Sequence, residues 1–182
     1  MINNILKHVS GQAGGCSQIT KNFIQITSKL GEPDLIVSRV FDAPRELVFK
    51  TYVDPNLLPQ WWGPRNLITI VDKMELRPGG TWRFINREPD GKKYTFSGVY
   101  LEILPFERYS FTFNFEGRSG RESTETVTFE DQGGKTKVTD RYNFKSVEDR
   151  DEMIKFGLET GAAESMDRFG NLLEKLQKDR AC

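Results

Sequence analysis

A run of short strand-like segments between Leu67 and Phe144 constrains the fold of this chain more than any other feature. In these segments β-branched and aromatic residues alternate with polar ones, and turn-forming pieces such as Pro78-Gly79-Gly80 and Pro89-Asp90-Gly91 separate them. Short strands divided by turns predict an antiparallel meander. The aromatic residues fall on one face and Thr, Ser, Arg and Asn on the other, so we expect only one face to be buried.

Helical patterns stand before and after the predicted sheet. A strand over Leu35–Asp42 leads into two short helices, which Asp42-Ala43-Pro44 and Asp54-Pro55 begin, because an Asp cap followed by Pro suits a first helical turn. At the other end, Ser146 has Asp149 at the capping-box position, which predicts that the chain ends in helix.

The apolar residues of the C-terminal segment recur at intervals of three and four, which is typical of one face of a long helix. They are Leu158, Ala162, Ser165, Phe169, Leu172, Leu173 and Leu176, with one polar member. Only this helix, of about 20 residues and 30 Å, is long enough to cover the sheet. We therefore predict an α+β fold: a curved antiparallel sheet of about seven strands wrapped around a long C-terminal helix, with two short helices after the first strand.

The charge balance and hydropathy of the chain exclude several kinds of partner. The 182 residues include 26 basic and 26 acidic side chains, so no net charge attracts nucleic acid or anionic lipid. No stretch is long and apolar enough for a membrane span, and the first residues lack the apolar core of a signal peptide. We expect no nucleic-acid partner, no membrane partner and a cytoplasmic location.

The scarcity of histidine and cysteine excludes much site chemistry. The single histidine is His8, and the two cysteines, Cys16 and Cys182, stand at opposite ends of the chain. A zinc site needs such residues in a cluster, and a Ser-His or Cys-His nucleophile would have to recruit His8. Glycine-rich phosphate motifs are absent as well. We therefore predict no metal, no cofactor, no catalytic residue and free thiols.

The composition changes at residue 33. Residues 1–33 are poor in aromatic residues and contain the stretch Gly11–Gly15, so we expect a largely flexible N-terminal extension before a domain over 34–182. Apolar residues between Ile2 and Val9 leave a short membrane or partner anchor open as an alternative. Phe23–Thr27 could add a short edge strand.

The adjacent Trp61 and Trp62 in DPNLLPQWWGP pose a question of burial. Neighbouring residues of a helix diverge by about 100°, so the two rings cannot serve the same face. We predict that Trp61 anchors the short helix to the core and that Trp62 lies at the mouth of a cavity between sheet and helix.

Alternation along the strands predicts the lining of that cavity. The expected apolar lining residues are Trp62, Trp82, Phe84, Phe96, Tyr100, Phe111, Phe113, Phe129, Tyr142, Met166 and Phe169. By alternation along their strands, Glu102 and Asp140 fall on the same face as aromatic neighbours, so they are the candidates for polar groups in the cavity. So many rings on a concave sheet predict a ligand pocket with a few orienting polar groups, whereas the alternative is a solid aromatic core.

Four stretches together resemble the activator of heat-shock-protein-90 ATPase homologue family. They are RVFDAPRELVFKTYVDPNLLPQWWGP, ELRPGGTWRF, FSGVYLEILPFERYSFTF and GAAESMDRFGNLLEKL. The resemblance covers about residues 34–178 and implies the START-like, helix-grip (SRPBCC) fold, a superfamily that includes lipid-transfer proteins, polyketide cyclases and plant pathogenesis-related proteins. It also implies a cavity for a hydrophobic ligand.

Three functions are consistent with this resemblance. The first is a small-molecule binding domain for a lipid-like, aromatic or polyketide-like ligand, and we rank it above an enzyme. The second is a cyclase- or hydrolase-type enzyme with Glu102 or Asp140 as general base, since a carboxylate among aromatic rings has a raised pKa. The third is a chaperone-binding domain, although the eukaryotic activators carry a further N-terminal domain that 33 residues cannot supply. A homodimer is left open.

Overall fold

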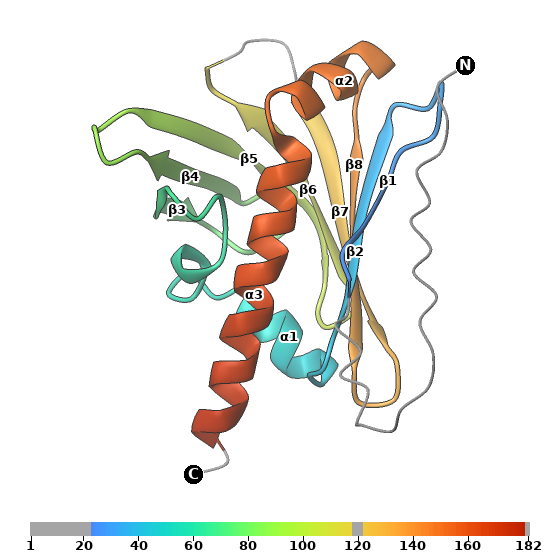
Figure 1. Cartoon of the computed structure of the whole chain (residues 1–182), viewed down its shortest axis with the longest axis vertical. Helices are drawn as coiled ribbons and strands as arrows, with labels where there is room; N and C mark the ends of the chain where they lie inside the picture. Colours follow the sequence, from blue (N-terminus) through green and yellow to red (C-terminus); the bar gives the residue numbers. More distant parts are fainter. Residues whose placement is uncertain (1–22, 118–121, 181–182) are drawn as a thin grey trace, which may run out of the picture.

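The computed structural model describes residues 23–117 and 122–180, and within them an eight-stranded sheet curves around one long helix (Figure 1). The strands are β1 (Gln25–Thr27), β2 (Asp34–Phe41), β3 (Ile68–Met74), β4 (Thr81–Arg87), β5 (Lys93–Leu104), β6 (Arg108–Phe115), β7 (Glu122–Asp131) and β8 (Thr136–Asn143). The helices are α1 (Arg45–Tyr52), the 3-10 helix η1 (Leu58–Gln60), α2 (Val147–Lys155) and α3 (Leu158–Arg180).

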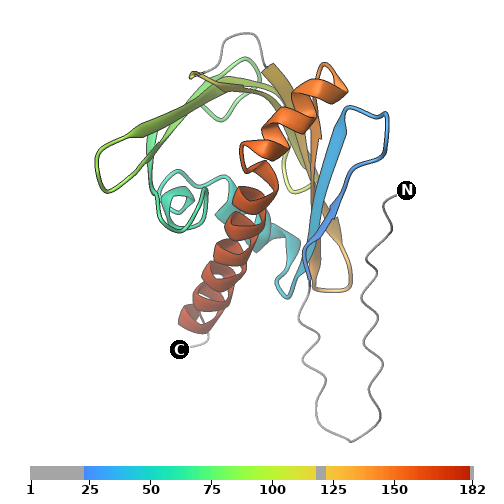
Figure 2. The same cartoon turned by 45° about the horizontal axis from the view of Figure 1, so that its top comes forward.

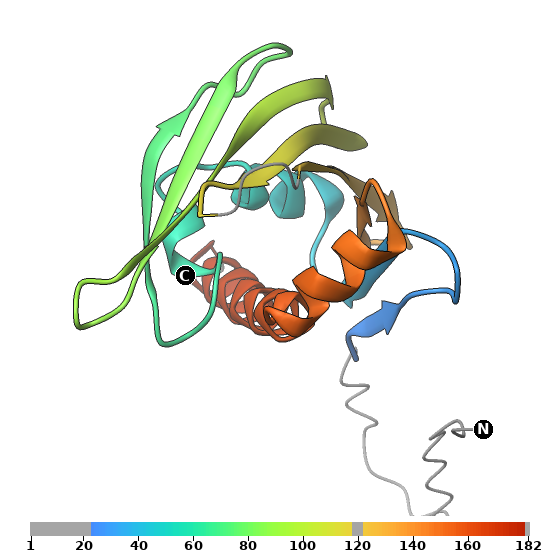
Figure 3. The ribbon, with the colours of Figure 1, turned by 90° about the horizontal axis from the view of Figure 1, so that it is seen from above.

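All neighbouring strands are antiparallel, in the order β1-β2-β8-β7-β6-β5-β4-β3. Seen from above, the sheet forms an arc and α3 crosses its open side (Figure 3). α1 lies between the sheet and α3 near one end of the arc (Figure 2), where it contacts β7 and α3. The predicted α+β fold is confirmed, with eight strands rather than about seven.

The additional strand is β1, which pairs with β2 through Gln25 to Thr27. The part of the predicted N-terminal extension that the structure describes therefore includes an edge strand, as the pattern at Phe23–Thr27 indicates. Residues 1–22 lie outside the described residues, and so do His8, Cys16 and Cys182.

Local sequence signals account for the helix starts in part. α1 follows Pro44, which takes the N-cap position without a side-chain hydrogen bond, so the cap predicted at Asp42 does not form. The Asp54 carboxylate accepts a hydrogen bond from the backbone N–H of Asn56 at 2.8 Å in the turn before η1, but the N-cap of η1 is Leu57, so Asp54 does not cap that helix either. The Ser146 hydroxyl accepts a hydrogen bond from the N–H of Asp149 at 3.2 Å at the start of α2. α2 and α3 are separate helices, because Gly157 between them has φ of 102°, which L side chains rarely adopt.

The alternation predicted for the strands sets the inner face of the sheet. In β7 the buried residues are Ser123, Glu125, Val127 and Phe129, and each intervening residue is partly exposed. α3 buries Met166, Phe169, Leu172 and Leu173 against this face, the stripe that its sequence spacing predicts. Even α3, the longest helix in the described ranges, is too charged along its length to act as a membrane span, and no other helix there qualifies.

Phe169 gives the first testable prediction, because its fully buried ring has centroids of the Phe41, Tyr52 and Trp61 rings within 5.2 Å. Truncating a packed Phe costs about 3–5 kcal/mol through lost contacts and the cavity left behind. Phe169→Ala should lower the free energy of unfolding in denaturant by that amount. Phe23→Ala, at a site 81% exposed, should change it by less than about 0.5 kcal/mol. Equal effects of the two substitutions would show that Phe169 does not join these elements.

Candidate functional site

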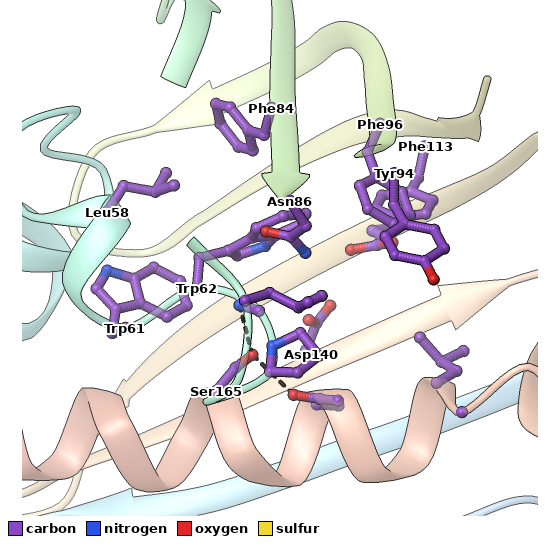
Figure 4. Close-up of a pocket in the computed structure, with 18 of the residues that line it drawn as sticks. Leu58, Trp61, Trp62, Phe84, Asn86, Tyr94, Phe96, Phe113, Asp140 and Ser165 are labelled. Carbon is purple, nitrogen blue, oxygen red and sulfur yellow. Dashed lines mark hydrogen bonds between the residues drawn. The ribbon is translucent and has the colours of Figure 1, made fainter. Parts of the chain in front are cut away.

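A cavity of about 440 Å³ lies between the concave face of the sheet, α3 and the segment around η1. This volume falls within the range of about 300–1,000 Å³ that is typical of small-molecule sites. Figure 4 shows the labelled side chains gathered around one space, with Phe84 on the side opposite Ser165 of α3. Exposed residues that border the cavity, such as Asn66, Lys92 and Phe156, mark where it reaches solvent.

The structure brings most of the predicted lining residues together. Those that border the cavity are Trp62, Trp82, Phe84, Phe96, Tyr100, Phe111, Phe113, Tyr142 and Met166. The rings contact one another along the wall: Trp82 lies 5.5 Å from Phe111 and 5.7 Å from Phe113 between centroids. The aromatic residues thus form a lining and do not fill the space that they surround.

Phe129 and Phe169 do not border the cavity, contrary to prediction. Both rings face inward, but α1 covers that end of the sheet: Phe129 packs on Phe49 at 5.3 Å and on Tyr52 at 5.5 Å. Strand parity identifies the inner face correctly. It does not show which part of that face another helix covers.

Glu102, the first polar candidate, lies on the outside of the sheet. A β-bulge between Tyr100 and Glu102 shifts the register of β5 against β6, so the two residues no longer share a face. Glu102 instead pairs with Arg108 at 2.7 Å, and both side chains are nearly half exposed. The prediction for Glu102 is wrong for this reason.

Asp140, the second candidate, borders the cavity and is 5% exposed. Beside it lies Glu125 of β7, which is 4% exposed and also borders the cavity. We call Glu125 and Asp140 the acid pair. Sequence reasoning missed Glu125, although it alternates with Val127 and Phe129 and its inward direction could have been read from that pattern.

The acid pair holds its protons far more tightly than ordinary carboxyl groups do. Burial raises the pKa of Asp140 to about 7, against the opposing effect of a hydrogen bond with Tyr142. Burial and the nearby Asp140 raise the pKa of Glu125 well above its usual range. Among residues 23–117 and 122–180, Glu125 Oε1 and Asp140 Oδ1 find no hydrogen-bond partner. The pair therefore retains a proton near neutral pH and offers unused acceptor atoms.

The two tryptophans occupy different environments. Trp61 is 2% exposed, and its ring lies 4.4 Å from that of Tyr52 and 4.9 Å from that of Phe169, in the core. Trp62 is partly exposed and meets the rings of Phe84 and Phe96 edge-on at 5.4 Å. Both border the cavity, but only Trp62 also faces solvent.

Hydrogen bonds from α3 hold the segment Trp61–Pro64, which we call the tryptophan loop. The N–H of Gly63 donates to the Ser165 hydroxyl at 2.9 Å, and the Arg168 guanidinium donates to the carbonyl oxygen of Gly63 at 2.8 Å. Gly63 has φ of 82°, and a Cβ there would lie 2.8 Å from the Asn86 amide. Only glycine fits this turn without strain.

The chemistry available at the buried wall of the cavity is that of rings, phenols and the two carboxyl groups of the acid pair, with Glu88 and Lys92 nearer the rim. Among residues 23–117 and 122–180, no group of three His, Cys, Asp or Glu side chains is placed to hold a metal ion. In the part of the chain that the structure describes, the buried indole N–H groups of Trp61 and Trp82 have no partner, and neither do the two acid-pair oxygens. The cavity can therefore enclose an apolar body and exchange hydrogen bonds with a few polar atoms on it.

Comparison with known proteins found one matching family model and several similar solved structures. The sequence model of one family, described as Activator of Hsp90 ATPase homolog 1-like protein, matches residues 42–174. None of the curated proteins matches the chain.

Three solved structures illustrate the likeness. Protein Ms6760 from Mycobacterium smegmatis is 26% identical, with a TM-score of 0.76 over 82% of this chain and 96% of that one. The AHSA1 protein from Silicibacter pomeroyi is 27% identical, with a TM-score of 0.64 over 78% of this chain and 97% of that one. A protein from Arthrobacter aurescens is 23% identical, with a TM-score of 0.77 over 83% of this chain and 91% of that one. These structures confirm the predicted helix-grip fold.

The tryptophan pair gives a prediction that separates packing from binding. Trp61→Ala should cost about 3–5 kcal/mol of stability, because it removes a buried ring that packs on Tyr52 and Phe169 in the core. Trp62→Ala should cost less, because the partly exposed ring has fewer packing partners, and should change the uptake of a hydrophobic fluorescent probe. Thermal melts and probe titrations measure the two effects. If both substitutions destabilise the protein equally and leave probe uptake unchanged, then both rings serve only as core residues.

The raised pKa values of the acid pair predict the pH dependence of stability. The usual values, 3.8 for Asp and 4.5 for Glu, apply when the chain is unfolded, so between about pH 5 and pH 8 the folded state binds more protons. The contribution of the protonated acid pair to stability is therefore fully present below about pH 4 and is lost as the pH rises through 7. The melting temperature should fall by several degrees over this range.

Asp140→Asn should flatten that slope, because it removes one titrating group and the charge that raises the pKa of Glu125. Subtracting the melting temperature of the variant from that of the wild type at each pH removes the contribution of titrating groups outside the pair. Parallel pH profiles for the two proteins would contradict the assigned protonation.

Proposed function

This chain belongs to the Activator of Hsp90 ATPase homolog 1-like family, and from that premise and its cavity we propose that it binds a hydrophobic small molecule. The ligand class is lipid-like or aromatic. The observation that carries the proposal is the cavity of about 440 Å³ with an aromatic wall. The description of the family names a chaperone activator, whereas the geometry of the interior supports a binding site.

The wall has the composition expected of a binding site. Side chains of β4, β5 and β6 supply apolar rings, and α3 closes the space with small residues, Gly161 and Ala162, which leave room beneath the helix. The buried polar side chains of the wall are few, chiefly Asn86 and the acid pair, as in sites where polar groups orient a ligand. The acid pair and the Trp82 ring belong to the cavity wall.

The structure also supports a second candidate, an enzyme of the cyclase or hydrolase type. Asp140 lies in the cavity with a pKa of about 7, which suits a general base near neutral pH. The two functions differ in what happens to a bound compound. Mass spectrometry of the ligand released after incubation should show an unchanged mass for a binding protein, whereas a changed mass would establish an enzyme.

Filling the cavity tests the proposal directly. Ala162 borders the cavity and its neighbour Ala163 does not. Ala162→Phe therefore adds a ring at the cavity wall, and Ala163→Phe adds the same ring at a position outside the lining. The neutral fluorophore N-phenyl-1-naphthylamine serves as the probe, with thermal melts to verify folding. Ala162→Phe should weaken binding by about tenfold or more, because the added ring occupies the ligand volume. Ala163→Phe should bind as the wild type does.

Probe binding that both substitutions leave unchanged would place the probe outside the cavity. That result would contradict the proposed function, as would a folded wild-type protein that does not bind the probe.

A further inference from the structure

We propose that the cavity selects amphiphiles that carry a protonated amine, whose ammonium group Glu125 and Asp140 receive at the inner wall. The inference rests on the proposed function and adds the chemistry of the ligand's polar end. Three features of the described residues carry it: the position of the acid pair, the charges around it and the rings beside it.

The acid pair is built into adjacent strands. Glu125 is directly opposite Tyr142 in the β7–β8 register, and Asp140 is opposite Val127, so the two acidic residues are diagonal neighbours on the inner face. Side chains so placed are within reach of one ligand group. Each has an oxygen with no partner among the described residues, Oε1 of Glu125 and Oδ1 of Asp140. A buried carboxyl group left unsatisfied is costly, so the pair favours a donor that a ligand can bring.

Within the described ranges, no cation lies against the pair. Of the basic residues that the structure describes, Lys92 alone borders the cavity, and it is exposed, with its Nζ 4.9 Å from the Tyr94 ring centroid. Glu88, also near the rim, is acidic. The charge inside the cavity is therefore negative or neutral, never positive. An anionic ligand would meet like charge, whereas an ammonium group would meet opposite charge.

The other titratable groups that face the pair are phenols. Tyr52 comes from α1, Tyr109 from β6 and Tyr142 from β8, and the acid pair contributes to the raised pKa of each. α3 contributes Met166 and Ser165 to the cavity, which carry no charge. Phenols that stay protonated can donate to a carboxylate but cannot neutralise it. A positive charge that balances the ionised pair would therefore come from the ligand.

Aromatic faces surround the same space. A cation within about 6 Å of a Trp, Tyr or Phe face is attracted by the ring, and aromatic cages with acidic groups recognise ammonium ligands for this reason. The apolar part of the ligand would lie along the wall formed by Phe84, Phe96 and Phe113 (Figure 4). Its amine would replace the proton that the free pair holds, and that proton would pass to solvent.

Isothermal titration calorimetry with the whole chain tests this with three matched probes. They are 4-phenylbutylamine, 4-phenylbutan-1-ol and 4-phenylbutyrate, which share one apolar body and differ in charge. The amine should bind about tenfold more tightly than the alcohol, and the carboxylate should bind most weakly. An alkylamine stays protonated to about pH 10.4, so amine affinity should rise between about pH 6 and pH 8 as the pair ionises.

Three substitutions identify the group responsible. Glu125→Gln and Asp140→Asn keep the shape of the side chain and remove its charge, so each should reduce the preference for the amine over the alcohol. Glu102→Gln, on the outer face of β5, is the matched control and should leave the preference unchanged. Two separate acid-pair variants are used so that one unfolded variant does not end the test.

The outcomes separate this inference from the proposed function. If the alcohol binds as tightly as the amine, or if affinity does not change with pH, the amine preference is wrong. If the neutral naphthylamine probe binds while none of the three matched probes does, the inference fails and the proposed function stands. If no probe enters the cavity of the folded protein, both fail.

Discussion

Arg168 on α3 donates hydrogen bonds to the carbonyl oxygens of Pro59 at 3.2 Å and Gly63 at 2.8 Å, and so holds the tryptophan loop (Trp61–Pro64) against the helix. Ser165, on the same side of α3, accepts from the Gly63 N–H. A buried backbone group left without a partner costs about 1–3 kcal/mol, so these bonds fix both the loop and the rotation of α3. The site depends on this attachment, since it sets Trp61 in the core and Trp62 over the cavity.

The same arrangement explains how an aromatic interior can stay open. α3 packs on α1, α2, η1 and β2, so it is supported at several places around the inner face. Trp61 and Phe169 fill the space beneath one part of the helix. Beyond them, Gly161 and Ala162 bring little volume toward the rings of the sheet. The cavity is thus the part of the interior that the supporting contacts do not fill.

Local signals in the sequence predicted most of this fold. Turn residues separated the strands, and the Ser146 cap and the spacing from Leu158 to Leu176 defined the C-terminal helices, because each depends on neighbouring residues alone. The resemblance to the family was also confirmed, over residues 42–174.

The site was predicted less completely, because its shape depends on tertiary contacts. The bulge after Tyr100 turned Glu102 outward, and the one glycine of that strand, Gly98, stands before the bulge and does not fix its position. α1 covered Phe129 through packing that strand parity does not encode. Glu125 could have been found from alternation alone, and its pairing with Asp140 required the register of β7 against β8.

The central claim is that the aromatic cavity is a real binding space rather than a gap that the rings close in solution. A high-resolution crystal structure of the protein grown with N-phenyl-1-naphthylamine tests it most directly. Continuous density for the probe is expected between Trp62 and Phe113, with both rings lining the cavity as they do in this structure. Rings collapsed into the space, with the probe absent or bound only on the outer surface, would contradict it.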